Sequence, residues 1–249
     1  MQLIHHTVSP HQELFVYETY RLYGQNGRFR LLQFSETAVQ GAMDLNRPER
    51  ILFEYPQAMI HLMEHHLPEF RSAFMIGLGI GTIPRHFPAN TFKIAELDEE
   101  VIRISREYFG YTADNVAAGD GRNLLAAEPP ASLDFILVDA FNPAGTPRHL
   151  TSLEFFRLAD SRLASKGAVI LNLAGKESND RHINAIHTTL ARVFKHTAAY
   201  VLPSSGRQCN ILLAGSHMPV AGRPSQMAGF REAVLEEGHC VRDPRSWRD

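Results

Sequence analysis

Cysteine and long apolar runs are both scarce in this sequence. Its two cysteines, Cys209 and Cys240, exclude a disulfide scaffold and a zinc site with four cysteine ligands. No apolar run reaches the roughly 18 residues that a membrane-spanning helix needs. The first ten residues lack the basic and apolar regions of a signal peptide. These absences predict a soluble, cytoplasmic protein that has no membrane as a partner.

An excess of charge of either sign is also absent. The 25 lysines and arginines nearly balance the 27 aspartates and glutamates, which gives a net charge of −2. A strongly basic surface is therefore excluded, and we expect no nucleic-acid partner. The 249 residues, 44% of them hydrophobic, are enough for one α/β domain with a modest appendage or for two small domains.

The first part of the chain has β-strand patterns. Polar and apolar residues interleave over 14–23, 28–34 and 36–45, which predicts a small antiparallel sheet. Apolar spacing over 49–67 then predicts a helix, or two short helices broken at Pro56.

From residue 73 onward, short apolar runs alternate with amphipathic stretches. This alternation predicts a mostly parallel seven-stranded sheet with helices on both faces, in an α/β fold. The expected strands lie at 73–81, 92–98, around Val116, and at 133–141, 168–174, 196–203 and 209–215. The expected helices lie at 99–109, 152–164 and 180–194, with another possible at 230–237. We therefore divide the chain into a β region (1–48), a helical link (49–72) and a core (73–249).

A glycine-rich turn follows the first core strand. Gly77, Gly79 and Gly81 would let the backbone approach a ligand closely, although such a turn alone could equally serve packing. Glu96 and Asp98 end the next strand, where an acid can accept hydrogen bonds from ribose hydroxyls.

Two further acids follow at the ends of later strands. Asp120, before Gly121, could accept a hydrogen bond from an adenine amino group or could form an ordinary Asp-Gly turn. Asp139 ends its strand where the reacting end of a nucleoside would lie. Carboxylates repel phosphates, so the pattern favours an S-adenosyl sulfonium over a dinucleotide.

Several motifs together resemble a known family. GLGIGTIPRHF, AELDEEVIRISREYF, GDGRNLL and LVDAFNPAGTPRHLTSLEFF are similar to segments of the polyamine aminopropyltransferases, the spermidine synthase family. The resemblance runs from about residue 14 to 214 and is greatest to a divergent spermidine-synthase-like branch. It implies a small N-terminal β region and a Rossmann-like core of the class I S-adenosylmethionine-methyltransferase type. It also implies a homodimer, an amine or other small acceptor, and decarboxylated S-adenosylmethionine as the co-substrate.

The resemblance also implies roles for particular residues. Gln40 would lie near the nucleoside, Glu96 would bind its ribose, and Asp120-Gly121 would meet the adenine. Asp139 would be the catalytic carboxylate that helps to deprotonate the attacking amine.

Three positions depart from the family pattern. Ile80 replaces an acid of the glycine loop, Asn142 replaces a second acid after Asp139, and Gln57 replaces an acid after Tyr55. A di-cation needs carboxylates to offset its desolvation, so an altered acceptor is expected. With Tyr55 and His149, these three residues are the candidate substrate-binding set.

His149 and the histidines near residue 61 leave alternatives open. His149 is either a helix-entry residue or a wall or proton relay for the acceptor. The run 61–65 matches H-x-x-E-H, but no motif supplies a third ligand, so we expect no metal site.

The reaction is open as well. Methyl transfer from S-adenosylmethionine and nucleoside binding without turnover both compete with aminopropyl transfer. In each case we expect no tightly bound cofactor.

Overall fold

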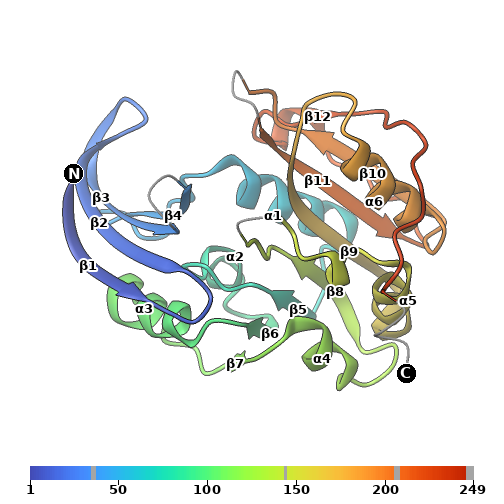
Figure 1. The fold of residues 1–249 in the computed structure, drawn as a ribbon, viewed down its shortest axis with the longest axis horizontal. Coiled ribbons are helices and arrows are strands. Elements are labelled where there is room, and N and C mark those ends of the chain that lie inside the picture. The colour runs from blue at the N-terminus through green and yellow to red at the C-terminus, as the bar shows by residue number, and fades with distance from the viewer. Residues whose placement is uncertain (35–37, 143–144, 205–207, 245–249) are drawn as a thin grey trace.

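The first of the two sheets is antiparallel. The computed structural model describes residues 1–34, 38–142, 145–204 and 208–244 (Figure 1). The strands of the first sheet pair in chain order: β1 (Gln2–Val8), β2 (Glu13–Leu22), β3 (Gln25–Phe34) and β4 (Ala38–Asp44). The alternating pattern predicted this small sheet, but β1 was not among the predicted strands.

A single helix connects the two sheets. Helix α1 (Glu54–His66) contains Pro56 in its first turn, where the missing N–H would have no intrahelical acceptor in any case. Pro56 therefore does not break the helix, and the two-helix alternative is wrong. The buried side chains of α1, including Met59 and Met63, pack in one cluster with the sheet residues Met75 and Phe135.

The second sheet has eight strands in the order β12-β10-β11-β9-β8-β5-β6-β7. The predicted seven are all present, and β12 adds a two-residue strand at one edge. Strand β5 pairs in parallel with β6 and β8, β6 with β7, and β8 with β9, whereas β11 is antiparallel to β9 and β10. The strands are β5 (Ser72–Ile76), β6 (Thr91–Glu96), β7 (Val116–Ala118), β8 (Leu133–Val138), β9 (Leu163–Gly175), β10 (His196–Val201), β11 (Cys209–Ser216) and β12 (Arg231–Glu232).

The predicted helix at 230–237 is wrong. Arg231 and Glu232 instead pair with Val201 and Tyr200 of β10, and no helix is present over 230–237. The open edge of β10 offers backbone hydrogen bonds that override the local helical pattern.

Helices cover both faces of the large sheet. Strand residues alternate between the faces, so Met75 joins the cluster under α1 while Phe74 and Ile76 join the cluster under the other face. The remaining helices are α2 (Thr82–His86), α3 (Glu99–Phe109), α4 (Gly121–Ala126), α5 (Leu153–Arg162) and α6 (Arg181–Ala191), with short 3₁₀ turns η1 (Arg148–Leu150) and η2 (Pro224–Gln226). In the described part of the chain, every helix is too short or too polar to cross a membrane.

The small sheet packs against the glycine loop and α3. Leu14 and Leu32 of the small sheet share a buried cluster with Ile80, Val101 and Ile104 of the core. Strand β4 and the β1–β2 turn thereby lie near the carboxyl ends of β5, β6 and β8 (Figure 1). Ligands of parallel α/β sheets bind at that edge.

Candidate active site

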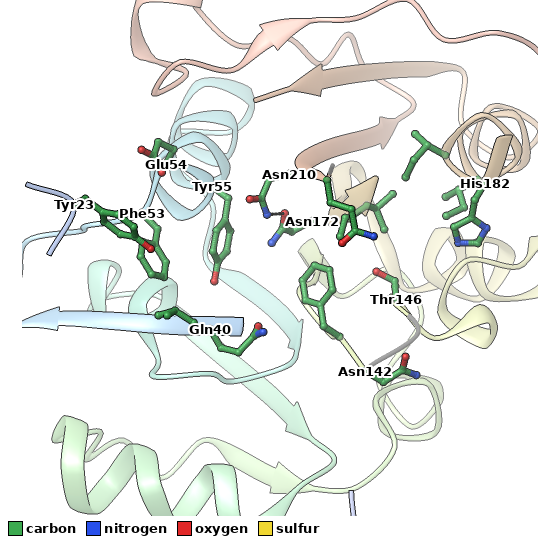
Figure 2. Close-up of a pocket in the computed structure, with 18 residues that line it drawn as sticks. Tyr23, Gln40, Phe53, Glu54, Tyr55, Asn142, Thr146, Asn172, His182 and Asn210 are labelled. Atoms are coloured by element: carbon green, nitrogen blue, oxygen red, sulfur yellow. Dashed lines mark hydrogen bonds between the residues drawn. The ribbon is translucent and has the colours of Figure 1, made fainter. Parts of the chain in front are cut away.

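Two cavities meet between the small sheet and the core. The smaller, of about 250 Å³, lies at the carboxyl ends of β5, β6 and β8. The larger, of about 640 Å³, extends towards β9, β11 and α6 (Figure 2). Four residues line both cavities: Gln40, Tyr55, Phe141 and Asn142. A ligand in one cavity would therefore adjoin a ligand in the other.

The glycines of the turn have different surroundings. Gly77 and Gly79 line the smaller cavity, both at positive φ (+97° and +55°). A Cβ on Gly77 would lie 2.3 Å from the carbonyl oxygen of Asp139, whereas one on Gly79 would meet no atom within 4 Å. The glycine at 77 is therefore required by the close approach of two backbone segments.

Two predicted glycines do not reach the cavities. A Cβ on Gly81 would lie 2.3 Å from the ring of Tyr111, and one on Gly121 would lie 2.3 Å from Ile76. Neither glycine lines either cavity. These glycines allow close packing beside α2 and α4, and their place in a nucleoside site stays a prediction.

Glu96 supports the glycine turn from the end of β6. Its carboxylate accepts hydrogen bonds from the backbone N–H groups of Leu78 (2.8 Å) and Asp98 (3.0 Å). Burial raises the pKa of Glu96 above its usual value, although these backbone hydrogen bonds oppose the rise. Asp98 is itself 2% exposed and caps α3 by accepting from the N–H of Glu100. Both acids line the smaller cavity.

Asp120 and His149 form a pair on another wall of the smaller cavity. Asp120 caps α4 by accepting from the N–H of Asn123 (3.0 Å), and its other oxygen lies 2.9 Å from Nε2 of His149. His149 belongs to η1, immediately before α5, so it is at a helix entry and also lines the cavity.

Asp139 follows β8 and lines the smaller cavity, and its partners Asn172 and Tyr55 line the larger one. Asn172 Nδ2 donates to Asp139 Oδ1 (2.9 Å), and Asn210 donates in turn to Asn172 (3.0 Å). Burial raises the pKa of Asp139, while hydrogen bonding from Asn172 and Tyr55 partly offsets the rise. The pKa of Tyr55 is raised well above its usual value by burial and by Asp139. Tyr55 therefore keeps its proton and acts as a donor to the carboxylate.

Amides dominate the polar lining of the larger cavity. In Figure 2 its carboxylate, Glu54, and its imidazole, His182, lie on opposite sides. Tyr23 and Phe53 add aromatic walls, with ring centroids 6.2 Å apart. Among the described residues that line either cavity there is no lysine or arginine. The amides are Gln40, Asn142, Asn172, Gln208 and Asn210.

The predicted substrate-binding set is only partly assembled. Tyr55 and Asn142 line both cavities, and Ile80 lines a narrow extension beside Asp139 while packing into the buried cluster under the small sheet. Gln57 lies outside both cavities: its amide donates to the carbonyls of Ile51 and Phe53 (3.1 Å each). Gln57 therefore makes a contact at the start of α1, and its predicted role in substrate binding is not supported by its position.

Several lining residues were not predicted from the sequence, among them Asn172, Glu54, His11 and Gln12. Glu54 lines the larger cavity, and it could have been predicted because it directly precedes Tyr55, a predicted substrate-binding residue. His11 and Gln12 line the smaller cavity from the β1–β2 turn. No sequence signal marks them, because the small sheet's packing brings them there.

Comparisons with known proteins agree with this architecture. The spermine/spermidine synthase domain profile matches residues 52–218. The chain is 31% identical over 250 residues to the polyamine aminopropyltransferase of Vibrio vulnificus, covering 94% of this chain and 79% of that protein. It is also 29% identical over 162 residues to putrescine N-methyltransferase 1 of Nicotiana tabacum, covering 59% of this chain and 42% of that enzyme.

A solved structure shares the fold over nearly the whole chain. It is a probable spermidine synthase from Corynebacterium glutamicum, with a TM-score of 0.82, 20% identity and 96% of each chain covered. The matched share of the curated relatives' own length varies, from 29% to 79%. The profile match and the identity to the Vibrio protein show that this chain belongs to the spermine/spermidine synthase domain family.

Proposed function

We propose that this protein transfers an aminopropyl group from decarboxylated S-adenosylmethionine to a small amine. One observation carries the proposal. The carboxylate of Asp139 lines the smaller cavity, and its two hydrogen-bond partners, Asn172 and Tyr55, both line the larger one. Family membership supports the same reaction class. The nucleoside would occupy the smaller cavity and the amine the larger one.

The smaller cavity suits a nucleoside without phosphates. Carboxylates of Glu96, Asp98, Asp120 and Asp139 line it, and its described lining contains no lysine or arginine. Each oxygen of Glu96 that accepts a backbone N–H keeps a second lone pair, which can accept from a ribose hydroxyl. Asp120 and His149 would lie beside the base.

The proposed reaction is a displacement at the carbon next to the sulfonium. The amine nitrogen forms a bond to that carbon as the carbon–sulfur bond breaks. The electron pair of the broken bond passes to sulfur, which releases methylthioadenosine. The amine proton passes to Asp139, whose raised pKa favours its acceptance. Asn172 and Tyr55 fix the carboxylate so that it faces the amine.

Removing the charge of Glu96 is expected to weaken nucleoside binding. Glu96→Gln or Glu96→Ala would lose charge-assisted hydrogen bonds worth about 1–3 kcal/mol, roughly a 5- to 150-fold rise in Kd. Calorimetric titration with methylthioadenosine measures the change. The exposed Glu107→Gln on α3 is the control, since its carboxylate pairs only with Arg103 among the described contacts. Unchanged affinity in folded Glu96→Ala would reject the assignment.

We also propose that the acceptor carries less positive charge than a polyamine. Amides outnumber carboxylates in the larger cavity, and Ile80 and Asn142 stand where the family pattern has acids. Glu54 does supply one carboxylate in the larger cavity, but this does not replace both acids that the family pattern has at positions 80 and 142.

A matched pair of amines tests this acceptor proposal. Putrescine and 4-amino-1-butanol have the same length but differ in one distal charge. We expect putrescine to have no advantage in kcat/KM when decarboxylated S-adenosylmethionine is the donor. Two results together would contradict the proposal. Putrescine would turn over at about 1 s⁻¹, at the low end of ordinary enzymes, and its kcat/KM would exceed that of 4-amino-1-butanol tenfold or more. If Glu54→Gln then removed that preference, Glu54 would be the residue that holds the second ammonium.

Methyl transfer is the second candidate. It is favoured by the apolar Ile80 beside Asp139 and by the similarity to putrescine N-methyltransferases. The leaving nucleoside distinguishes the two reactions: aminopropyl transfer releases methylthioadenosine, and methyl transfer releases S-adenosylhomocysteine. The homodimer and the cytoplasmic location stay predictions; light scattering tests the first and cell fractionation the second.

A further inference from the structure

The segment 238–243 lies across α5 and α6, and we call it the C-terminal strap. The backbone N–H groups of Gly238 and Val241 donate to Thr188 and Thr189 of α6 (2.8 Å each). The carbonyl of Val241 accepts from the N–H of Leu153 at the start of α5 (2.9 Å). A Cβ on Gly238 would lie 2.5 Å from the backbone of Ala185, so the strap is packed closely against the core.

A buried ion pair fastens the strap to α4. Arg122 donates to both carboxylate oxygens of Asp243, at 2.9 and 2.6 Å. The side chains of Asp243 and Arg122 are only 3% and 20% exposed. Burial alone would raise the pKa of Asp243, but hydrogen bonds from Arg122 and Ser152 hold it below its usual value. Bidentate geometry and burial make this pair stronger and more rigid than a surface ion pair.

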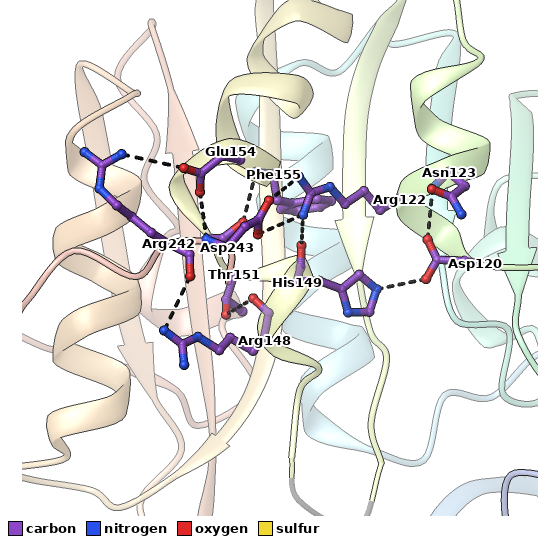
Figure 3. Close-up of polar contacts among 11 residues, drawn as sticks. Asp120, Arg122, Asn123, Arg148, His149, Thr151, Glu154, Phe155, Arg242 and Asp243 are labelled. Atoms are coloured by element: carbon purple, nitrogen blue, oxygen red, sulfur yellow. Dashed lines mark hydrogen bonds and ion pairs between the residues drawn. The ribbon is translucent and has the colours of Figure 1, made fainter. Parts of the chain in front are cut away.

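The same guanidinium reaches the smaller cavity through His149. Arg122 Nη1 also donates to the carbonyl oxygen of His149 (3.1 Å), and the imidazole of His149 lies against Asp120 (2.9 Å) (Figure 3). An uninterrupted series of polar contacts therefore runs from Asp243 through Arg122 to two residues that line the cavity.

We propose that Arg122 and Asp243 are positioning residues: the C-terminal strap holds the His149 wall of the nucleoside cavity. The role of that cavity as a nucleoside site rests on the proposed function, whereas the contacts that hold His149 do not. Without its carboxylate partner, Arg122 would be a buried cation that must seek water or another acceptor. Its bond to the His149 carbonyl would then be lost or displaced, and the His149–Asp120 pair with it.

Matched variants of adjacent strap residues separate this role from a general effect on stability. Asp243→Asn removes the charge that holds Arg122, and Arg122→Lys keeps a charge but cannot hold both Asp243 and the His149 carbonyl in the same way. The control is Arg242→Gln. The Arg242 side chain is half-exposed, and its Nη1 lies 3.6 Å from the Glu154 carboxylate. Glu154 accepts from the backbone N–H of Asp243 (3.0 Å), so Arg242 reaches the series only through that backbone group and not through the Asp243 carboxylate.

The first measurement needs no nucleoside. Diethylpyrocarbonate modifies accessible imidazoles, and mass spectrometry of the peptide containing residue 149 gives the rate at His149. We expect a severalfold faster rate in Asp243→Asn and Arg122→Lys and the wild-type rate in Arg242→Gln. A wild-type rate at His149 in folded Asp243→Asn and Arg122→Lys would overturn the proposal.

The second measurement is nucleoside binding below the unfolding transition of each variant. We expect Asp243→Asn to raise the Kd of methylthioadenosine about 2- to 30-fold, the range for side chains that act through neighbours. The preference for methylthioadenosine over methylthioinosine should fall as well, which a loss of stability alone would not cause. An unchanged preference and Kd would overturn the positioning role. If His149 became reactive while the wild type bound neither nucleoside, the strap contact would be supported and the proposed function refuted.

Discussion

Asp139→Asn is expected to lower the rate of group transfer about 10²- to 10⁴-fold, the usual contribution of a positioned general base. Asparagine keeps the shape of the side chain and can still accept from Asn172, but it cannot take a proton from the amine. Nucleoside affinity should change much less than the rate. Product formation and calorimetric titration on the same preparation measure both quantities.

Stability and pH provide the checks on this result. The raised pKa of Asp139 means that burying its charged form costs folding free energy at neutral pH, so Asp139→Asn should not lower Tm. In the wild type, kcat/KM should fall as the pH drops through the raised pKa of Asp139, at higher pH than for an aspartate with the ordinary value of 3.8. Asp114→Asn, at a fully exposed carboxylate, is the matched control. Wild-type turnover in folded Asp139→Asn would show that Asp139 is not the base.

Gly77→Ala is expected to destabilise the protein by about 2–6 kcal/mol. Alanine at a φ of +97° adds about 1–3 kcal/mol of backbone strain. Its Cβ would also lie 2.3 Å from the Asp139 carbonyl oxygen, a collision in a packed interior that adds about 1–3 kcal/mol. Because that carbonyl belongs to the proposed base, residual folded protein should also lose activity. Urea unfolding measures the loss of stability.

Gly79→Ala is the natural comparison for Gly77→Ala. Its φ of +55° costs about 1 kcal/mol for alanine, and its Cβ meets no atom within 4 Å. We expect this variant to fold and to bind methylthioadenosine more weakly, because the new methyl group lies at the smaller cavity. Equal losses of stability in the two variants would contradict the assigned roles of these glycines.

Local sequence patterns predicted most of the fold, because the spacing of apolar residues reflects which face of each strand or helix is buried. Period-two alternation and short apolar runs marked β2 to β11, and glycine and acid positions marked where the core strands end. The failures lie where distant contacts decide. Residues 231–232 pair with the edge of β10 rather than forming a helix. The sequence also left open two short helices broken at Pro56, whereas Pro56 lies in the first turn of one continuous helix, α1.

The candidate site was predictable where strand ends fix the side chains. Glu96, Asp120 and Asp139 each lie at the carboxyl end of a parallel strand, so the common edge of the sheet brings them to one cavity. Gln57 lies outside the cavities because its amide donates to the backbone carbonyls of Ile51 and Phe53, whereas Glu54 of the same helix lines the larger cavity.

Other features of the site depend on contacts that no local pattern encodes. His11 and Gln12 reach the smaller cavity only because the small sheet packs on the core. Likewise, the contact between Arg122 and Asp243 joins residues 121 positions apart in the chain.

Calorimetric titration of the wild type with decarboxylated S-adenosylmethionine, S-adenosylmethionine and methylthioadenosine tests the central claim most directly. The described lining of the smaller cavity offers carboxylates but no lysine or arginine to pair with the α-carboxylate of S-adenosylmethionine. We therefore expect the decarboxylated form to bind most tightly and S-adenosylmethionine most weakly. Tightest binding of S-adenosylmethionine would contradict the aminopropyl assignment, and no binding of any of the three would contradict the nucleoside site itself.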